Sequence, residues 1–141
     1  MAEGMTDKVY DFLTAPQVTA AEIKAKRRAR AERLSAAIPG AIRYDVPRVQ
    51  SSPSDRMSAA IADVDELDRE IADLKDRMKN ERRAIVDAAD QFLDYQERRV
   101  IILRYIDRAS WSCIASVLHR SKSTIHRIHR SAGEKLSTIC G

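Results

Sequence analysis

The chain has 141 residues, of which 33% are charged and 44% hydrophobic, and its net charge is +4. This length predicts one domain or two very small ones, and the composition excludes a membrane protein and a clearly disordered chain. Its four glycines lie far apart and it has two cysteines, which excludes a glycine-rich phosphate loop and a disulfide framework. The N-terminus has no signal-peptide pattern, so we expect a cytoplasmic protein.

Charge is distributed unevenly along the chain. Residues 1–54 carry a net charge of +3, residues 55–97 a net charge of −6, and residues 98–141 a net charge of +7. In the last segment nine Lys and Arg stand against two Asp and Glu. Such a basic block suggests an anionic partner. We expect a nucleic acid, with a solvated basic surface as the alternative.

The N-terminal region, residues 1–38, predicts two helices. Thr6 is a suitable N-cap for a short helix through Leu13. Pro16 is expected to end this helix, because proline lacks the backbone N–H that a helix interior needs. Thr19 and Glu22 then form a capping box, which predicts the start of a second helix rich in Ala, Lys, Arg and Glu.

Basic side chains crowd the second of these helices. They are Lys24, Lys26, Arg27, Arg28, Arg30 and Arg33. A solvated helix face is the simplest interpretation, and a secondary contact with nucleic acid is the alternative. The next segment, residues 39–54, contains three of the four prolines and several serines, which predicts a linker.

A heptad pattern begins at Asp55 and predicts a long helix over residues 55–93. When Met57 is taken as position a, one charged residue, Glu81, interrupts twelve a and d positions. Such a sustained pattern is typical of a coiled coil. The positions expected to mediate oligomerisation are Val64, Leu67, Ile71, Leu74, Met78 and Ile85.

This long helix needs a partner. It would be about 55 Å long at roughly 1.5 Å per residue, which is too long to bury its apolar stripe on the C-terminal segment alone. The partner is either the N-terminal helix folded back or a second copy of the chain. Residues flanking the stripe would attract in some pairs, as for Glu70 and Lys75, and repel in others, as for Asp63 and Asp68. Parallel and antiparallel pairings therefore both stay open.

Residues 94–141 predict three short helices. Asp94 and Glu97 form an acidic capping box that begins the first, near YQERRVIILRYI. Ser110 caps the second, WSCIASVL, and Ser121 caps the third, KSTIHRIHRSAGEKLS. Two serine-capped helices joined by a two-residue turn match a helix-turn-helix.

The third of these helices is the candidate for contact with DNA. If Ile125 and Ile128 face the core, its other faces carry hydrogen-bond donors and cations without a carboxylate, and such a helix fits the major groove. Arg104 and Arg108 are candidates for contacts with the DNA backbone. The candidate DNA-binding residues are Arg120, Ser121, Lys122, Ser123, Thr124, His126, Arg127 and Arg130.

The C-terminal segment resembles region 4 of bacterial sigma factors over ILRYIDRASWSCIASVLHRSKSTIHRIHRSAGEKL. The shared features are an apolar-Arg-Tyr helix end, an Ile-Ala pair in the second helix, and Ala-x-x-Lys-Leu in the third. With Trp111, His129 and the VQSS loop at residues 49–52, the chain is similar to phage-encoded ArpU/RinA-like regulators over residues 20–139. This resemblance implies a regulator that switches on phage or prophage late genes in a bacterial host cell.

Three features depart from the region 4 pattern. His119 occupies the turn position that is usually a glycine with positive φ, a conformation that His tolerates better than most residues do. Lys122, Ser123 and Thr124 stand where Arg and Glu are usual, so we expect a different target sequence. Gly133 lies inside the third helix and opposes an unbroken helix, because glycine has a low helix propensity.

No constellation in the sequence indicates catalysis or a metal centre. His126 and His129 lie three residues apart, but no Cys-x-x-Cys accompanies them, and a basic helix surface is the simpler interpretation. Neither cysteine lies in a setting that would activate a nucleophile. We therefore expect no enzyme, no cofactor and no metal.

Together these features predict an all-α, sequence-specific regulator that binds double-stranded DNA. The heptad helix is the expected oligomerisation region, and host RNA polymerase is a further candidate partner by analogy. One alternative is a DNA-binding subunit of a phage packaging or recombination machine. Another is a coiled-coil adaptor whose basic tail binds an acidic protein.

Overall fold

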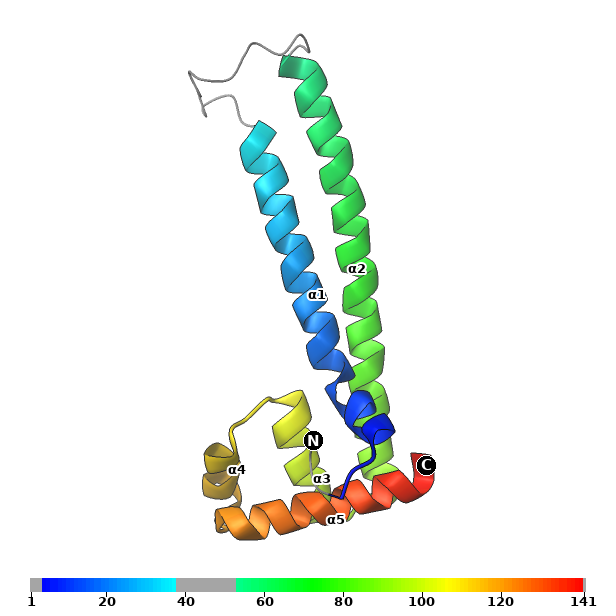
Figure 1. Ribbon diagram of the computed structural model, residues 1–141, viewed down its shortest axis with the longest axis vertical. Helices are drawn as coiled ribbons and strands as arrows, with labels where there is room; N and C mark the ends of the chain where they lie inside the picture. The colour runs from blue at the N-terminus through cyan, green and yellow to red at the C-terminus, as the bar shows by residue number, and fades with distance from the viewer. Residues whose placement is uncertain (1–3, 38–52, 141) are drawn as a thin grey trace. The chain divides into compact units, whose positions relative to one another are not determined.

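The computed structural model describes residues 4–37 and 53–140, and these form helices without a strand (Figure 1). The predicted all-α class is therefore confirmed. None of these helices is both long enough and apolar enough to cross a membrane. The elements in chain order are α1 (Asp7–Ala37), α2 (Pro53–Phe92), α3 (Tyr95–Ile101), the π-helical turn η1 (Ile102–Ile106), α4 (Trp111–Leu118) and α5 (Lys122–Cys140).

Helix α1 differs from the prediction because it runs through Pro16 without a break. Proline inside a helix costs about 3 kcal/mol, since it removes one hydrogen bond and crowds the preceding turn. Burial of Pro16 and of its neighbours Leu13 and Thr19 offsets this cost. The predicted helix end at Pro16 is wrong, and so is the predicted capping box of Thr19 and Glu22, because both residues lie within α1.

The chain divides into two compact units. One unit contains Met1–Val18 and Arg77–Gly141, and the other contains Thr19–Asp76. These units cut across the predicted divisions at residues 38, 54 and 93, because both long helices pass from one unit into the other. Most of the predicted linker at residues 39–54 lies outside the described residues, while its last two residues begin α2.

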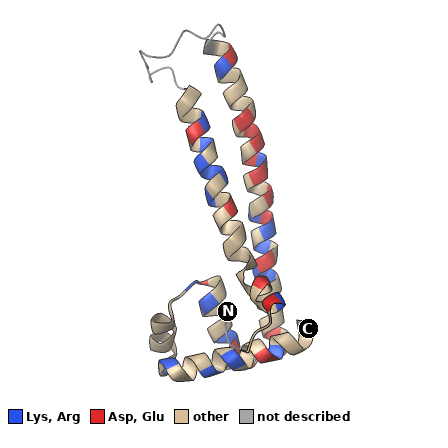
Figure 2. Cartoon of the chain, in the orientation of Figure 1, with Lys and Arg blue, Asp and Glu red and all other residues tan. Residues whose placement is uncertain are grey.

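In the unit Thr19–Asp76, basic residues of α1 pair with acidic residues of α2 (Figure 2). The pairing is antiparallel, because the residue numbers rise along α1 as they fall along α2. Each pair is partly exposed to solvent, and such pairs contribute about 0–1 kcal/mol, so they favour one register more than they stabilise the fold. The three ion pairs are Lys26–Glu70 at 2.8 Å, Arg30–Asp68 at 2.7 Å and Arg33–Asp63 at 2.7 Å.

The heptad stripe of α2 therefore packs on α1 of the same chain, the folded-back alternative. Val64 and Ile71 are buried in this unit, and Ile85 is buried in the other. Leu67, Leu74 and Met78 are partly buried. An oligomer formed through these six residues is not shown. The buried ones, Val64, Ile71 and Ile85, would have to leave their present neighbours to contact a second copy.

In the other unit, the N-terminal segment packs into the core of the C-terminal helices. Thr6 caps α1, since the Val9 N–H donates to its hydroxyl at 3.3 Å, as predicted. The Thr6 N–H in turn donates to Ser137 Oγ at 3.1 Å. The buried residues of this core are Met5, Val9, Leu13, Ile85, Ile101, Tyr105, Ala132 and Leu136. The predicted divisions give the N-terminal region and the C-terminal helices separate bounds, and no contact between them was predicted.

Gly133 has its explanation in this packing. Helix α5 continues past it to Cys140, so the expected weakness of the helix at Gly133 does not interrupt it. A Cβ at Gly133 would lie 3.2 Å from Met5 Cε and 3.3 Å from Met5 Cβ. The glycine therefore allows the N-terminal segment to approach α5 closely.

The packing of α1 on the C-terminal helices predicts the effect of truncating Leu13, which is fully buried. Leu13→Ala should lower the free energy of unfolding by about 2–5 kcal/mol, because it leaves a cavity between the two ends of the chain. Urea unfolding followed by circular dichroism measures this change. Val18→Ala, at a side chain 56% exposed, is the matched control and should change stability by less than about 0.5 kcal/mol. Equal stability of both variants would contradict this packing.

Candidate nucleic-acid interface

Helices α4 and α5 form the predicted helix-turn-helix, and serine side chains begin both. The Cys113 N–H donates to Ser110 Oγ at 3.1 Å at the start of α4. The Thr124 N–H donates to Ser121 Oγ at 3.2 Å at the start of α5. Both predicted caps are confirmed, and each satisfies a backbone donor that has no partner within its helix.

His119 makes the tight turn between the two helices. Its φ is 54° and its ψ is 45°, which is the left-handed conformation expected at this position. Its N–H donates to the Ala115 and Ser116 carbonyls, and the Arg120 N–H also donates to Ala115 O at 3.0 Å. These bonds close the end of α4 in the manner usual for a glycine.

A hydrophobic cluster separate from the core around Leu13 packs α5 against α3 and α4. Its buried members are Val100, Ile114 and Ile125. Ile128 is only partly buried but packs against the same cluster, as the prediction required. The orientation of α5 therefore follows from contacts of its apolar face with α3 and α4.

Most of the candidate DNA-binding residues are exposed. The exposed members are Arg120, Ser121, Lys122, Ser123, His126, Arg127 and Arg130. Thr124 is partly buried, and its hydroxyl accepts a hydrogen bond from Ser121 Oγ at 2.9 Å. Arg130 lies beside the N-terminal segment, since a Cβ at Gly4 would be 2.7 Å from its Cγ. The sequence has no Asp or Glu from residue 108 to residue 133, so the exposed face is free of its own acidic residues.

Trp111 joins this face to the core. Its ring centroid lies 4.6 Å from that of His126 and 4.9 Å from that of His129. The Arg104 guanidinium carbon lies 4.4 Å from the same ring, and Arg104 also donates to Ala109 O at 3.1 Å. The half-buried indole therefore contacts both the buried His129 and the exposed candidate residue His126, and it connects the position of His126 to the core.

His129 is a core residue that the analysis of the sequence missed. It is 4% exposed, and its Nε2 lies 2.7 Å from the Tyr105 hydroxyl. Burial, together with the nearby charges of His126 and Arg104, lowers the pKa of His129 to about 4. Burial also raises the pKa of Tyr105 to about 12. Both side chains are therefore neutral at pH 7.

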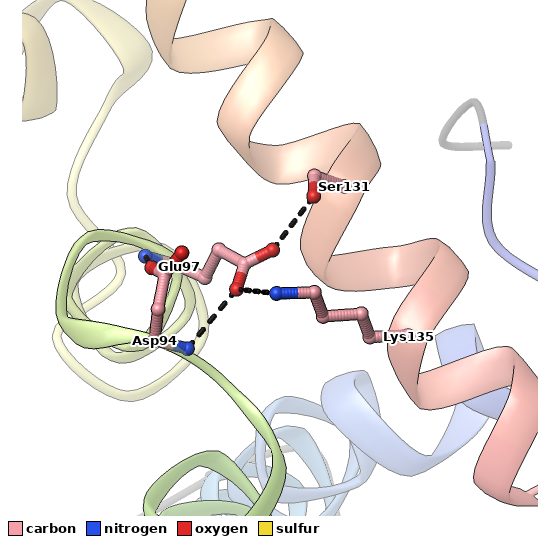
Figure 3. Close-up of polar contacts among 4 residues, drawn as sticks. All are labelled: Asp94, Glu97, Ser131 and Lys135. Carbon is pink, nitrogen blue, oxygen red and sulfur yellow. Dashed lines mark hydrogen bonds and ion pairs between the residues drawn. The ribbon is translucent and has the colours of Figure 1, made fainter.

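Glu97 connects the start of α3 to α5 (Figure 3). The predicted capping box is present, because the Glu97 N–H donates to Asp94 Oδ1 at 2.8 Å and the Asp94 N–H donates to Glu97 Oε1 at 3.0 Å. The same carboxylate accepts from Ser131 Oγ at 2.7 Å and from Lys135 Nζ at 2.6 Å. Neither of these two partners was predicted from the sequence.

The hydrogen bonds of Glu97 lower the pKa of its carboxyl more than burial raises it. Burial would raise the pKa of the Glu97 carboxyl, but the hydrogen bonds from Lys135, the Asp94 backbone and Ser131 together lower it. The charged form is therefore the stable one, although the side chain is 3% exposed. A buried charge with this many donors rigidly holds the helices that it connects.

Comparison with known families supports the C-terminal part of the prediction. Residues 91–138 match the family model of Sigma-70, region 4. This segment covers α3, η1, α4 and most of α5, and the match supports a sigma-like, DNA-binding helix-turn-helix there. No curated protein and no solved structure matched the chain.

Among the described residues, no cluster of three or more His, Cys, Asp or Glu side chains could hold a metal ion.

The contacts of Glu97 predict a pH-dependent loss of stability. Because its pKa is lower in the folded protein, it stabilises the fold at neutral pH, and this contribution is lost as the pH falls below the ordinary glutamate value of 4.5. Glu97→Gln should lower the free energy of unfolding at pH 7 by about 2 kcal/mol and should weaken this acid dependence. Chemical unfolding at several pH values measures both effects. Asp87→Asn, at an exposed carboxylate on α2, is the control, and equal curves for both variants would contradict the role of Glu97.

Burial of His129 predicts a second pH dependence at higher pH. The unfolded chain binds a proton near pH 6.5, whereas folded His129 binds one only near pH 4. The free energy of unfolding should therefore decrease as the pH falls from about 6.5 to about 4, by on the order of 3 kcal/mol. His129→Gln removes the titrating group, so its slope in this window should be smaller, whatever its stability at pH 7. The same slope in both proteins would show that His129 protonates equally well in the folded state.

Proposed function

We propose that the protein is a sequence-specific transcriptional regulator that binds double-stranded DNA by inserting α5 into the major groove. The observation that carries this proposal is the exposed N-terminal half of α5, which is oriented by the core and presents donors and cations without carboxylates. Arg127 and Lys122 are the side chains best suited to base edges, since basic side chains pair with guanine in the major groove. Ser121 and Arg120 suit the phosphate backbone.

The biological setting is a further part of this proposal. The resemblance to phage-encoded ArpU/RinA-like regulators supports a role as an activator of phage or prophage late genes in the cytoplasm of a bacterial host. Host RNA polymerase is the proposed protein partner, and the hairpin of α1 and α2 is a surface for it to contact. The proposal includes no catalytic activity and no cofactor.

Replacing Arg127 tests whether α5 recognises bases. Arg127→Ala should weaken binding to the specific duplex by about 1–3 kcal/mol more than binding to a random duplex. Fluorescence anisotropy with labelled fragments of the encoding genome, and a random duplex as competitor, measures this difference. Arg82→Ala, at an exposed arginine on α2, is the control and should leave discrimination unchanged.

The other outcomes decide between the functions. If Arg127→Ala weakens binding equally on both duplexes, Arg127 contacts phosphate and not a base. If the wild-type protein binds all fragments equally and weakly, a packaging or architectural role replaces the regulator. If it binds no duplex even at low salt, the DNA-binding function itself is wrong and an acidic protein becomes the expected partner.

A further inference from the structure

A pocket of about 440 Å³ lies beside the helix-turn-helix, and part of its wall comes from the N-terminal helix. Tyr10, Thr14 and Gln17 of α1 line one part of it. They are spaced by four and three residues, so they share one face of the helix. The rest of the wall comes from Arg104, Tyr105, Arg108 and Trp111. All of these residues belong to the same compact unit.

The chemistry of this pocket fits an anion. Two of its seven lining residues are arginines and none is acidic. Arg104 is held by Trp111 and by the Ala109 carbonyl, as described above, so its charge has a fixed position. Neither Arg104 nor Arg108 forms an ion pair with another of the residues that the structure describes.

The backbone around the pocket is also unusual. The π-helical turn η1 carries Arg104 and Tyr105 into the wall, and turns of this kind are frequent at functional sites. Arg108 has a φ of 58°, which is uncommon for a residue other than glycine. This conformation lets the Ala109 N–H donate to Leu103 O at 2.9 Å and ends the helical segment beside the pocket.

Two side chains of α1 have hydrogen-bonding groups available in this wall. The Thr14 hydroxyl already donates to the Tyr10 carbonyl at 2.8 Å. The Tyr10 hydroxyl and the Gln17 amide have no hydrogen bond to another described residue. Both groups are donors that suit a phosphate oxygen.

The pocket adjoins the surface that α5 presents to DNA. Trp111 belongs to the pocket wall, and its ring contacts that of the exposed His126. Trp111 is also the first residue of α4, where the helix carries partial positive charge. The Trp111 ring therefore links the pocket wall to a side chain on the exposed face of α5.

We propose that this pocket binds a phosphate of the DNA backbone and that Tyr10 and Gln17 of α1 donate hydrogen bonds to it. The inference rests on the proposed DNA-binding function and extends the interface beyond residues 91–138, since α1 lies outside the segment that matches Sigma-70 region 4. The N-terminal helix is then part of the DNA interface as well as of the core.

Three substitutions test this site in the full-length protein, by anisotropy at several salt concentrations. Arg108→Asn removes the charge with a residue that tolerates positive φ, and it should reduce the salt slope of binding by about 1. Tyr10→Phe combined with Gln17→Ala should weaken binding roughly tenfold on specific and random duplexes alike, because the contact is with phosphate. Lys8→Ala and Arg83→Ala, at exposed cations outside the pocket, are the controls and should leave the slope nearer to that of the wild type.

The outcomes distinguish a failure of the pocket proposal from a failure of the proposed DNA-binding function. If the pocket variants bind as the wild type does while Arg127→Ala loses discrimination, the DNA-binding function holds and the pocket proposal is wrong. Titration with inorganic phosphate alone, followed by the indole N–H signal of Trp111 in NMR spectra, tests the other source of the same anion. A phosphate-dependent shift with unchanged DNA affinity of the variants would overturn the backbone contact in favour of a free anion. Thermal unfolding of each variant confirms that it is folded.

Discussion

The buried carboxylate of Glu97 is the constraint on which the C-terminal helices depend. A charge removed from water is costly unless donors surround it, and Glu97 has donors from its own helix start and from Ser131 and Lys135 of α5. These bonds connect the first and last helices of the helix-turn-helix domain. Because α4 and α5 pack on α3 through Ile114 and Ile125, the direction in which α5 points follows from this connection.

The second constraint is the close approach of the two ends of the chain. Met5 lies closely against α5 at Gly133, where a side chain would crowd it. Leu13 then fills the core between α1, α2 and α5. In this arrangement the N-terminal turns of α1 stabilise the DNA-binding module from outside its own sequence segment, and they also bring Tyr10 and Gln17 to the pocket beside Trp111.

The sequence predicted those features that local chemistry determines. The caps at Asp94, Ser110 and Ser121 follow from the hydrogen bonds that short polar side chains make with nearby backbone, and all are present. The left-handed turn at His119 follows from its position between the two helices of the helix-turn-helix. The heptad pattern predicted a long helix, but it could not tell a folded-back α1 from a second copy.

The features that were missed depend on contacts between distant residues. The bond between Thr6 and Ser137 joins residues 131 positions apart, and no local pattern announces it. Pro16 was expected to end a helix because proline has a low intrinsic helix propensity. The burial that offsets this cost comes from tertiary packing, which the local sequence does not show. His129 was taken as helix surface, since its burial beside Tyr105 depends on how α5 crosses η1.

The exposed face of α5, oriented by these contacts, is the surface proposed to bind DNA. The most direct test is an NMR titration of the isotopically labelled full-length protein with a duplex that it binds, which follows every backbone amide. We expect the largest shifts at residues 120–130 and at the start of α4 near Trp111, with smaller shifts in the buried core. Shifts confined to residues 19–76, with α5 unaffected, would contradict this proposal and would place the interface on the helical hairpin.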